Sequence, residues 1–308
     1  MPIPDYAACM KPVLEVLSDR QIHSTREIPQ KIADHFGLTD EERDTRLLSG
    51  EQTYIRNRVG WATTYLGKAG LLERVTRGRI RITDQGLAVL AEKPASIDRE
   101  YLKKFPSIVE FLSPTTSPDD SAVTEQESVE LILDERTPDE TIESAYASIR
   151  NALADDLLAQ VMSCSPVFFE RLVIDLLIAM GYGGALPNAG RHMGRTGDGG
   201  IDGIINEDKL GLDMICIQAK RWKDSVGRPH VQAFAGSMEA HRAKKGVMIT
   251  TSTFTRDARD FVDRIERKIV LIDGTQLAQL MIDYNVGVAT AKTYTLKKID
   301  SDYFMDAE

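Results

Sequence analysis

The sequence predicts two domains of different class: a mainly helical winged-helix domain at the N-terminus and an α/β domain with a mixed central sheet at the C-terminus. The 308 residues are enough for two cores of ordinary size. The first part shows three helical patterns followed by two short strands, which is the winged-helix order. Later, strand-like runs alternate with helical patterns, as in an α/β sheet. The expected segments are 1–93, 94–162 and 163–308.

Composition and charge set limits on both domains. The chain is 42% hydrophobic and 28% charged, as a soluble globular protein is, and it shows neither a membrane-length apolar run nor a signal-peptide pattern, so we expect a cytoplasmic protein. Three dispersed cysteines argue against a disulfide framework or a zinc site. The net charge of −9 arises in residues 94–162, which carry 5 Lys and Arg against 15 Asp and Glu. The overall acidity therefore says little about what the two ends bind.

Three helices are expected before the hairpin. Apolar residues at helical spacing predict the first over residues 11–20. Thr25 is expected to cap a second helix over 26–36, which Gly37 ends. A polar loop with one extra turn then leads to the third helix, over 54–69. Four apolar side chains of the third helix are expected to face inward: Ile55, Val59, Ala62 and Leu66.

The hairpin follows as two short strands around a turn at Arg77 and Gly78, after which Thr83 or Asp84 caps a helix over 85–91. In a winged helix the third helix enters the major groove and the hairpin lies on phosphate. Solvated arginines, or a winged helix used for protein contacts, would give the same pattern. The arginines that we expect to contact DNA are Arg56, Arg58, Arg77, Arg79 and Arg81.

The middle segment is expected to be a linker followed by two helices. Four prolines between residues 94 and 120 indicate a stiff linker. Helices are predicted over 123–133 and 138–162, the second with an apolar stripe of Ile142, Ala145, Ile149, Leu153, Leu157 and Val161. One hypothesis is that the acidic residues repel DNA or mask a basic surface. The alternative is a solvated acidic face that aids solubility.

The C-terminal half reads as alternating helices and strands. Ser165 is expected to cap a helix over 166–180, with Glu170 in its first turn. No nucleotide-binding, zinc-protease or serine-hydrolase motif is present, so no nucleotide cofactor is expected. After a central hairpin, the remaining elements are expected as helices over 226–242, 255–267 and 275–284 and strands over 247–251 and 269–272.

The central hairpin carries the candidate chemistry. Its strands are expected over 201–205 and 212–221, with Asp202 near the start of the first and Gln218 and Lys220 near the end of the second. Alternate residues of a strand share one face, so these three side chains can converge on one pocket. A carboxylate and an amide oxygen suit Mg²⁺, and an ammonium beside the ion suits phosphodiester hydrolysis. An ordinary amphipathic hairpin would explain the same residues structurally.

Five stretches in order resemble Mrr-type restriction endonucleases, the modification-dependent class: FFERLVIDLLIAMGY, GRTGDGGIDGII, IQAKRW, VGRPHVQAFAGSM and KKGVMITTSTFT. They cover most of residues 165–275, and the winged-helix pattern matches the accessory domain of that family. The resemblance implies a restriction-endonuclease-like catalytic domain of the PD-(D/E)xK type. It also implies double-stranded, methylated DNA as the partner and a homodimer or higher homo-oligomer without a membrane role.

The resemblance also assigns roles to residues. It implies that Asp202, Gln218 and Glu170 hold Mg²⁺ or Mn²⁺ and that Lys220 completes the (D/E)xK element. A glutamine stands where an acid is usual, which leaves the site with less negative charge, so the number of ions is open. Asp198 is interpreted as a turn former and His192 as a phosphate contact or a residue without a role. Arg221 and Lys223 are expected to follow the DNA backbone.

Two other functions fit part of the pattern. A winged-helix DNA-binding regulator would need an α/β domain that is structural or inactive. An enzyme acting on RNA or on Holliday junctions would share the metal site and differ in substrate geometry. Metal-dependent cleavage that is lost on replacing Lys220 separates the endonuclease from the regulator.

Overall fold

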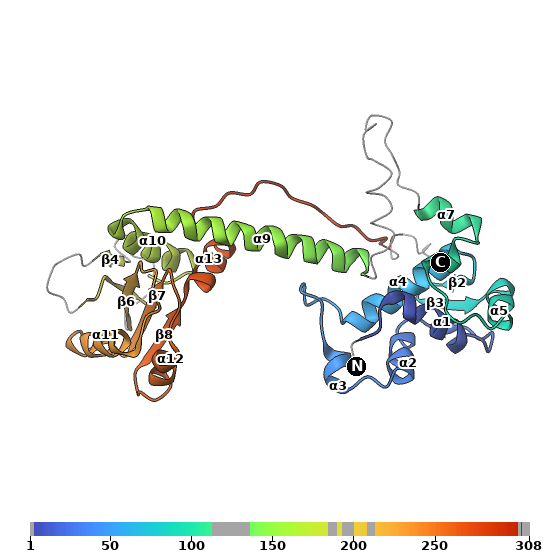
Figure 1. The fold of residues 1–308 in the computed structure, drawn as a ribbon, viewed down its shortest axis with the longest axis horizontal. Helices are drawn as coiled ribbons and strands as arrows, with labels where there is room; N and C mark the ends of the chain where they lie inside the picture. Colours follow the sequence, from blue (N-terminus) through green and yellow to red (C-terminus); the bar gives the residue numbers. More distant parts are fainter. Residues whose placement is uncertain are drawn as a thin grey trace. The chain divides into compact units, whose positions relative to one another are not determined.

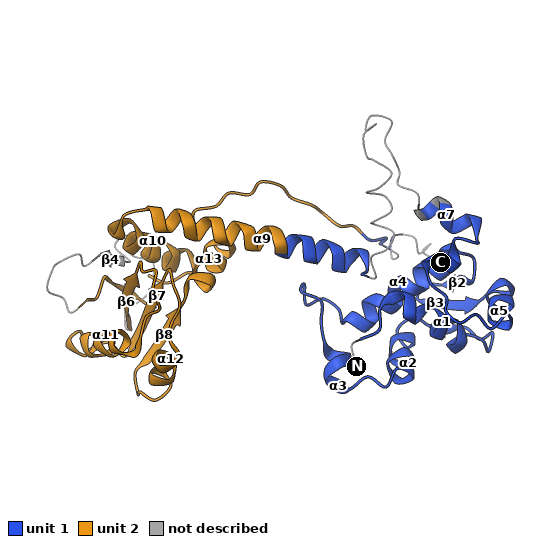
Figure 2. Cartoon of the chain, in the orientation of Figure 1, with its two compact units in different colours: residues 1–147, 298–308 blue, residues 148–297 orange. Residues whose placement is uncertain are grey.

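A computed structural model describes residues 3–112, 136–183, 190–192, 200–207, 213–300 and 303 (Figure 1). Contacts divide the chain into two compact units, residues 1–147 with 298–308 and residues 148–297 (Figure 2). Each unit has its own hydrophobic core. The predicted helix over 123–133 lies outside the described residues, as do Asp198 and the side chain of His192.

The first unit has the order of elements of a winged helix, with one short helix added between the second and third helices. Its strands form an antiparallel sheet in the order β1-β3-β2. The turn between β2 and β3 contains Gly78 at a φ of 67°, a conformation that glycine adopts without strain. The elements are α1 Tyr6–Val16, β1 His23–Ser24, α2 Ile28–His35, α3 Asp40–Asp44, α4 Tyr54–Lys68, β2 Leu72–Thr76, β3 Arg79–Ile82 and α5 Asp84–Ala91.

The bounds of the first two helices differ from those expected. Helix α1 begins at Tyr6 because the Asp5 side chain accepts a hydrogen bond from the Ala8 N–H, and it ends at Val16 rather than residue 20. Helix α2 begins at Ile28, and Thr25 does not cap it. The backbone N–H of Thr25 instead donates to the Gly78 carbonyl in the hairpin. Contacts between distant segments, which a local pattern does not contain, therefore set this boundary.

Other elements of the first unit follow the sequence closely. Helix α4 covers residues 54–68, and all four of its expected core side chains are buried. The extra turn after α2 is the helix α3, which Thr39 and Glu42 cap reciprocally. Thr83, one of the two residues expected to cap α5, forms the cap, since its hydroxyl accepts a hydrogen bond from the Gly86 N–H.

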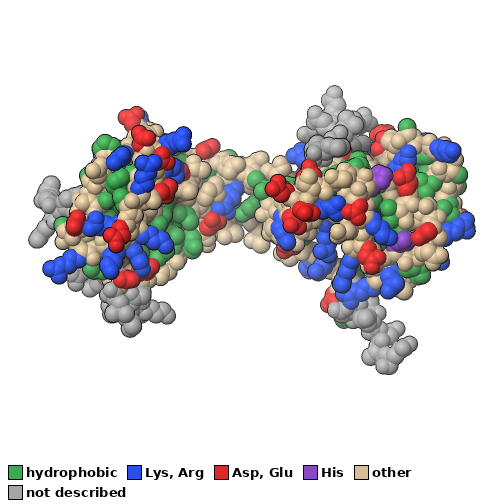
Figure 3. Space-filling model, turned by 90° about the horizontal axis from the view of Figure 1, so that it is seen from below, with side chains coloured by type: hydrophobic (Ala, Val, Ile, Leu, Met, Phe, Trp, Pro, Cys, Tyr) green, Lys and Arg blue, Asp and Glu red, His purple; other side chains and the backbone are tan. Residues whose placement is uncertain are grey.

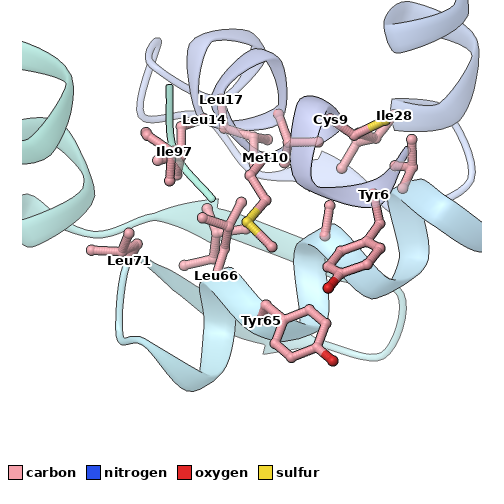
Figure 4. Packing of buried hydrophobic residues seen from close by; sticks show 14 of the residues in the cluster. Tyr6, Cys9, Met10, Leu14, Leu17, Ile28, Tyr65, Leu66, Leu71 and Ile97 are labelled. Atoms are coloured by element: carbon pink, nitrogen blue, oxygen red, sulfur yellow. The ribbon is translucent and has the colours of Figure 1, made fainter. Parts of the chain in front are cut away.

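The segment predicted to be a linker contributes to the first core over its described part. It forms α6 Arg99–Leu102 and α7 Pro106–Leu112. Ile97, Leu102 and Ile108 are buried in the cluster that Tyr6, Met10, Leu14 and Leu66 occupy (Figure 4). The linker prediction is wrong up to residue 112, because three spaced apolar anchors outweigh Pro94 and Pro106.

Helix α9 Pro138–Ser163 confirms the long helix expected in the middle segment. Its apolar stripe is buried only near the C-terminal end, where Leu157 and Val161 join the core of the second unit. Ile142, Ile149 and Leu153 are 49%, 70% and 39% exposed. The stripe therefore packs in the core only at Leu157 and Val161, and its earlier residues form an exposed apolar surface.

The second unit is an α/β domain built on a five-stranded mixed sheet in the order β4-β5-β6-β7-β8. Strands β4, β5 and β6 pair antiparallel, and β7 and β8 continue parallel to β6. This arrangement confirms the expected α/β class. The strands are β4 Gly190–His192, β5 Gly203–Asn206, β6 Met214–Lys220, β7 Lys245–Thr250 and β8 Lys268–Ile272.

Helices cover both faces of this sheet (Figure 1). One core joins α9, α10 Pro166–Ala179 and α13 Gly274–Asp283 to the face that presents Ile217 and Ala219. The other joins α11 Arg228–Ala240 and α12 Arg256–Val262 to the face that presents Cys216 and Met248. Within the part of the chain that the structure describes, no helix is long and apolar enough to span a membrane.

Candidate active site

The pairing of β5 with β6 brings the acid and the amide of the predicted site together. Gly203 pairs with Ile217, and the Asp202 N–H donates to the Ile217 carbonyl at 2.9 Å. Asp202 directly precedes β5, next to the last pair of the ladder, and Gln218 lies on the sheet face that presents Cys216 and Met248. Lys220 ends β6 two residues later and shares that face, because strand side chains alternate. The convergence of the three side chains on one pocket stays a prediction.

Gln218 has a buried oxygen without a partner. The side chain is 5% exposed, its Nε2 donates to the Gly200 carbonyl, and its Oε1 has no hydrogen-bond donor within the described residues. Reversing the amide would place two acceptors against each other at Gly200, so the unpaired atom is the oxygen. A buried polar atom without a partner destabilises the fold by about 1–3 kcal/mol. Such an atom is rare, and a ligand that supplies positive charge would satisfy it.

The turn before β5 is shaped around this amide. Gly200 has a φ of 86°, in the region that favours glycine. A Cβ atom at this position would lie 2.6 Å from the Gln218 Nε2. Gly200 thus accepts the amide hydrogen bond and leaves room for it, which fixes the orientation of Gln218.

The Asp202 carboxylate is held by the backbone of the opposite strand. Its Oδ2 accepts a hydrogen bond from the Ala219 N–H at 2.7 Å. Ala219 lies between Gln218 and Lys220, so this bond fixes the carboxylate beside the two other site residues.

This donor set fits a divalent cation. Asp202 and Gln218 present a carboxylate and a buried amide oxygen from neighbouring strands, and hard oxygen ligands are those that Mg²⁺ and Mn²⁺ prefer. The described residues contain no cluster of three or more His, Cys, Asp or Glu side chains that would make a purely protein-bound metal cage. A site of this kind leaves positions for water and for phosphate oxygens.

The predicted helix acid, Glu170, lies on α10. The buried residues Phe169 and Val173 of this helix pack on the sheet face that presents Ile217 and Ala219. Gln218 and Lys220 occupy the opposite face. A role for Glu170 as a metal ligand stays a prediction.

Two of the arginines expected to contact DNA are used to hold the fold. Arg58 donates its Nε to Glu140 at 2.7 Å and its Nη1 to the Ile3 carbonyl, and its side chain is 16% exposed. Arg221 donates to the carbonyl of Met162, in the last turn of α9, at 2.6 Å, where a cation suits the negative end of the helix dipole. Both side chains therefore have structural roles, and their DNA contacts stay predictions. The sequence could not show this, because both partners are distant in the chain.

The start of α9 is anchored to α4 by acidic side chains. Asp139 accepts hydrogen bonds from Asn57 at 2.6 Å and from Trp61 at 3.0 Å. Glu140 pairs with Arg58 and is 6% exposed. The solubility explanation of the acidic segment therefore does not hold for Glu140, which the fold buries. These two carboxylates cover one face of α4.

The other expected basic contacts remain on the surface. Arg56, Arg77, Arg79 and Lys223 are exposed, whereas Arg81 pairs with Glu73 at 2.6 Å in an exposed ion pair. Figure 3 shows basic and acidic side chains interspersed on the visible faces of both units. This mixture matches the charge outside residues 94–162, which sums to +1 because residues 94–162 carry −10 and the whole chain −9.

A pocket on the first unit was missed by sequence reasoning. It has a volume of about 520 Å³ and lies between α2, α3 and the start of α4. Arg26 and Arg56 line it with exposed side chains, and Pro29, Ala33 and Ile55 supply apolar surface. The sequence did not indicate that Arg26 lines a pocket, because it is a single arginine before α2, distant in the chain from Arg43 and Arg56.

The fold and this site define the class of protein. A mixed sheet with helices on both faces, with an acid, an amide and a lysine at neighbouring strand ends, is the arrangement of a restriction-endonuclease-type nuclease domain. The family model described as "Restriction endonuclease" matches residues 161–281, and the model described as "Mrr N-terminal domain" matches residues 6–92.

A curated relative covers the whole chain. The type IV methyl-directed restriction enzyme EcoKMrr of Escherichia coli (strain K12) is 37% identical over 317 aligned positions, which span 99% of this chain and 100% of the relative. The chain belongs to the Mrr family of restriction endonucleases.

Two solved structures are more distant. The DNA modification-dependent restriction endonuclease AspBHI is 18% identical, with a TM-score of 0.36 over 70% of this chain and 57% of its own. The MspJI restriction endonuclease in complex with a 27-mer oligonucleotide is 16% identical, with a TM-score of 0.26 over 70% of this chain and 53% of its own. This chain spans little more than half the length of either protein, and both scores are below the level at which a shared fold follows.

Proposed function

We propose that this chain is a metal-dependent endonuclease that hydrolyses phosphodiester bonds of methylated foreign DNA in a restriction system. The observation that carries the metal-dependent part is the buried, unpaired Oε1 of Gln218, next in the chain to the Ala219 N–H that holds the Asp202 carboxylate. The preference for methylated DNA rests on the relationship to a methyl-directed enzyme. Such an enzyme works where DNA is, so we expect it in the cytoplasm and on the nucleoid.

The site residues divide the work of hydrolysis. Asp202 and Gln218 would hold Mg²⁺ or Mn²⁺, which when bound polarises the scissile phosphate and lowers the pKa of a coordinated water. The Lys220 ammonium has three donors for a phosphate oxygen or for the attacking water. Asp202 keeps its orientation through the Ala219 N–H, so the carboxylate is already aligned before the substrate arrives.

The first unit is proposed to bind the DNA duplex. Covering one face of α4 with Asp139 and Glu140 leaves the face that carries Arg56, Thr64 and two glycines exposed. A Cβ atom at Gly60 would meet no neighbouring atom within 4 Å, so this surface is open and allows close approach of a groove. Arg77, Arg79 and Arg81 would lie along phosphate at the hairpin.

A second copy of the chain is proposed to pack on α9. Between Thr141 and Ala154 the only charged residues are Glu143 and Arg150. Both bond to their own chain: Glu143 accepts from the Leu48 N–H, and Arg150 pairs with Asp283. Breaking a duplex requires two cuts, and the exposed stripe is symmetric about its centre, so an antiparallel copy of α9 matches it. The stripe consists of Ile142, Tyr146, Ile149 and Leu153, which are 39–70% exposed and spaced by four, three and four residues.

The test of the proposed function is cleavage of methylated and unmethylated plasmid, with Mg²⁺ and with a chelator. Wild type is expected to nick methylated plasmid only with the metal ion, and Lys220→Ala to lose this activity by a factor on the order of 10² or more while still binding DNA. Lys244→Ala is the matched control, because Lys244 is exposed on a distant turn. Tight DNA binding by wild type without cleavage of either plasmid would instead support a winged-helix regulator.

A further inference from the structure

The Lys220 side chain has an aromatic neighbour two residues along the chain. Its Nζ lies 5.8 Å from the centre of the Trp222 ring, within the range of a cation–π contact. Within the described residues the ammonium forms no ion pair. The indole is therefore the group that defines where this ammonium lies before substrate binds.

The backbone of Trp222 is fixed to the end of the neighbouring strand. Its carbonyl accepts from the Thr251 hydroxyl at 2.9 Å, and its N–H donates to the Lys220 carbonyl at 3.0 Å. The Lys220 carbonyl also accepts from the Thr250 hydroxyl at 2.8 Å. These bonds join the loop after β6 to the end of β7, so Trp222 and Lys220 keep one geometry relative to each other.

The ring of Trp222 is also contacted by α11. His230, in the first turn of that helix, meets the indole edge to face, with ring centres 4.6 Å apart and planes at 81°. Aromatic pairs favour this arrangement. The indole is thus restrained by α11 through His230, and the Trp222 backbone is held by the ends of β6 and β7.

An aromatic ring suits this role better than a carboxylate. A carboxylate in place of the Trp222 ring would accept one or more of the three N–H groups of Lys220. The face of an indole attracts the ammonium without accepting a conventional hydrogen bond, so all donors stay available for a phosphate oxygen or a water.

We propose that Trp222 is a positioning residue for Lys220: it holds the ammonium over its ring, with His230 fixing the ring. The inference rests on the proposed nuclease function. Its contribution is to the rate of the chemical step and not to DNA affinity, because the indole acts through Lys220.

The first test compares Trp222→Leu with Trp222→Phe in single-turnover cleavage. The leucine variant is expected to lower the cleavage rate constant about tenfold with DNA affinity unchanged within about twofold, and the phenylalanine variant to keep most of the rate. Tyr101→Leu is the matched control, since it removes a lysine–aromatic contact of the first unit, in which Lys104 Nζ lies 3.9 Å from the ring centre. Equal rates for wild type and Trp222→Leu would overturn the inference.

The second test does not depend on activity. In protein labelled with ¹³C-lysine, Lys220→Arg identifies the Lys220 signals, and the indole is expected to shift the Cε protons upfield. Trp222→Leu should remove this shift and Trp222→Phe should keep part of it. A wild-type shift of zero contradicts the positioning, whereas a clear shift in a protein that cuts no DNA contradicts the proposed function and leaves the geometry standing.

Discussion

Arg58 and Gln218 are both polar side chains with little exposure on elements that the sequence marks as functional, and the structure treats them in opposite ways. Arg58 on α4 donates to Glu140 and to the carbonyls of Ile3 and Pro4. Gln218 on β6 keeps a buried oxygen without a partner. Arg58 stabilises the protein through bonds to its own chain, whereas Gln218 keeps an acceptor oxygen that a cation could use. Arg99 and Arg221 also have a buried Nε without a partner within the described residues, but these atoms are donors and cannot bind a cation.

The same comparison gives a structural reason for an amide at this position. The Gln218 Nε2 donates to the Gly200 carbonyl, which a glutamate cannot do. A carboxylate at this position would set two acceptors against each other inside the turn. The glutamine Nε2 donates to the Gly200 carbonyl in the turn, and its Oε1 remains available to bind a cation.

The largest expected effect comes from removing Arg58. Arg58→Ala leaves Glu140 buried and without its cation, so the free energy of unfolding is expected to fall by about 3–5 kcal/mol. Chemical denaturation measures this directly. A loss below about 1 kcal/mol, with DNA affinity strongly reduced, would return Arg58 to the DNA-binding surface.

Gly200 tests how far the turn controls the amide. Gly200→Ala forces a Cβ to within 2.6 Å of Nε2 at a positive φ, so we expect a loss of about 1–3 kcal/mol in stability together with a loss of cleavage. Gly181→Ala is the matched control, because it also has a positive φ but no atom within 4 Å of its Cβ position. Equal effects of the two substitutions on cleavage would show that the amide does not depend on the turn.

The proposed dimer contact on the exposed stripe of α9 is tested by placing a charged side chain in it. Ile149 is 70% exposed, so Ile149→Glu is expected to leave folding intact and to weaken self-association at least tenfold. Analytical ultracentrifugation measures the association constant, with Ser148→Glu on the same helix as a neighbouring control. A dimer of unchanged stability in Ile149→Glu would assign the contact to another surface.

Replacing Arg56 is expected to have the smallest effect on stability, in contrast to replacing Arg58, because Arg56 is exposed and Arg58 is largely buried. Arg56→Ala is expected to change stability by less than about 0.5 kcal/mol and to weaken DNA binding several-fold, because its side chain is exposed. The slope of log affinity against log salt should fall by about 1 if the arginine contacts phosphate. An unchanged salt slope would mean that this arginine is only solvated.

The sequence predicted most elements of both units, although not β1 or β4, because helix periodicity and strand alternation are local rules. It did not predict the burial of Ile97 and Ile108, the pairing of Arg58 with Glu140, or the contact of Arg221 with Met162. Each of these joins segments far apart in the chain. The unpaired Gln218 oxygen was equally hidden, since it depends on a hydrogen bond to Gly200.

The central claim is that Gln218 supplies an oxygen to a divalent cation. Titration of Mn²⁺ into the protein, followed by electron paramagnetic resonance, tests it by comparing wild type with Gln218→Leu and with Gln232→Leu, a substitution of an exposed glutamine of α11. We predict that Gln218→Leu weakens Mn²⁺ binding about tenfold or more, and that Gln232→Leu leaves it unchanged. Equal Mn²⁺ affinity in wild type and Gln218→Leu would contradict the account.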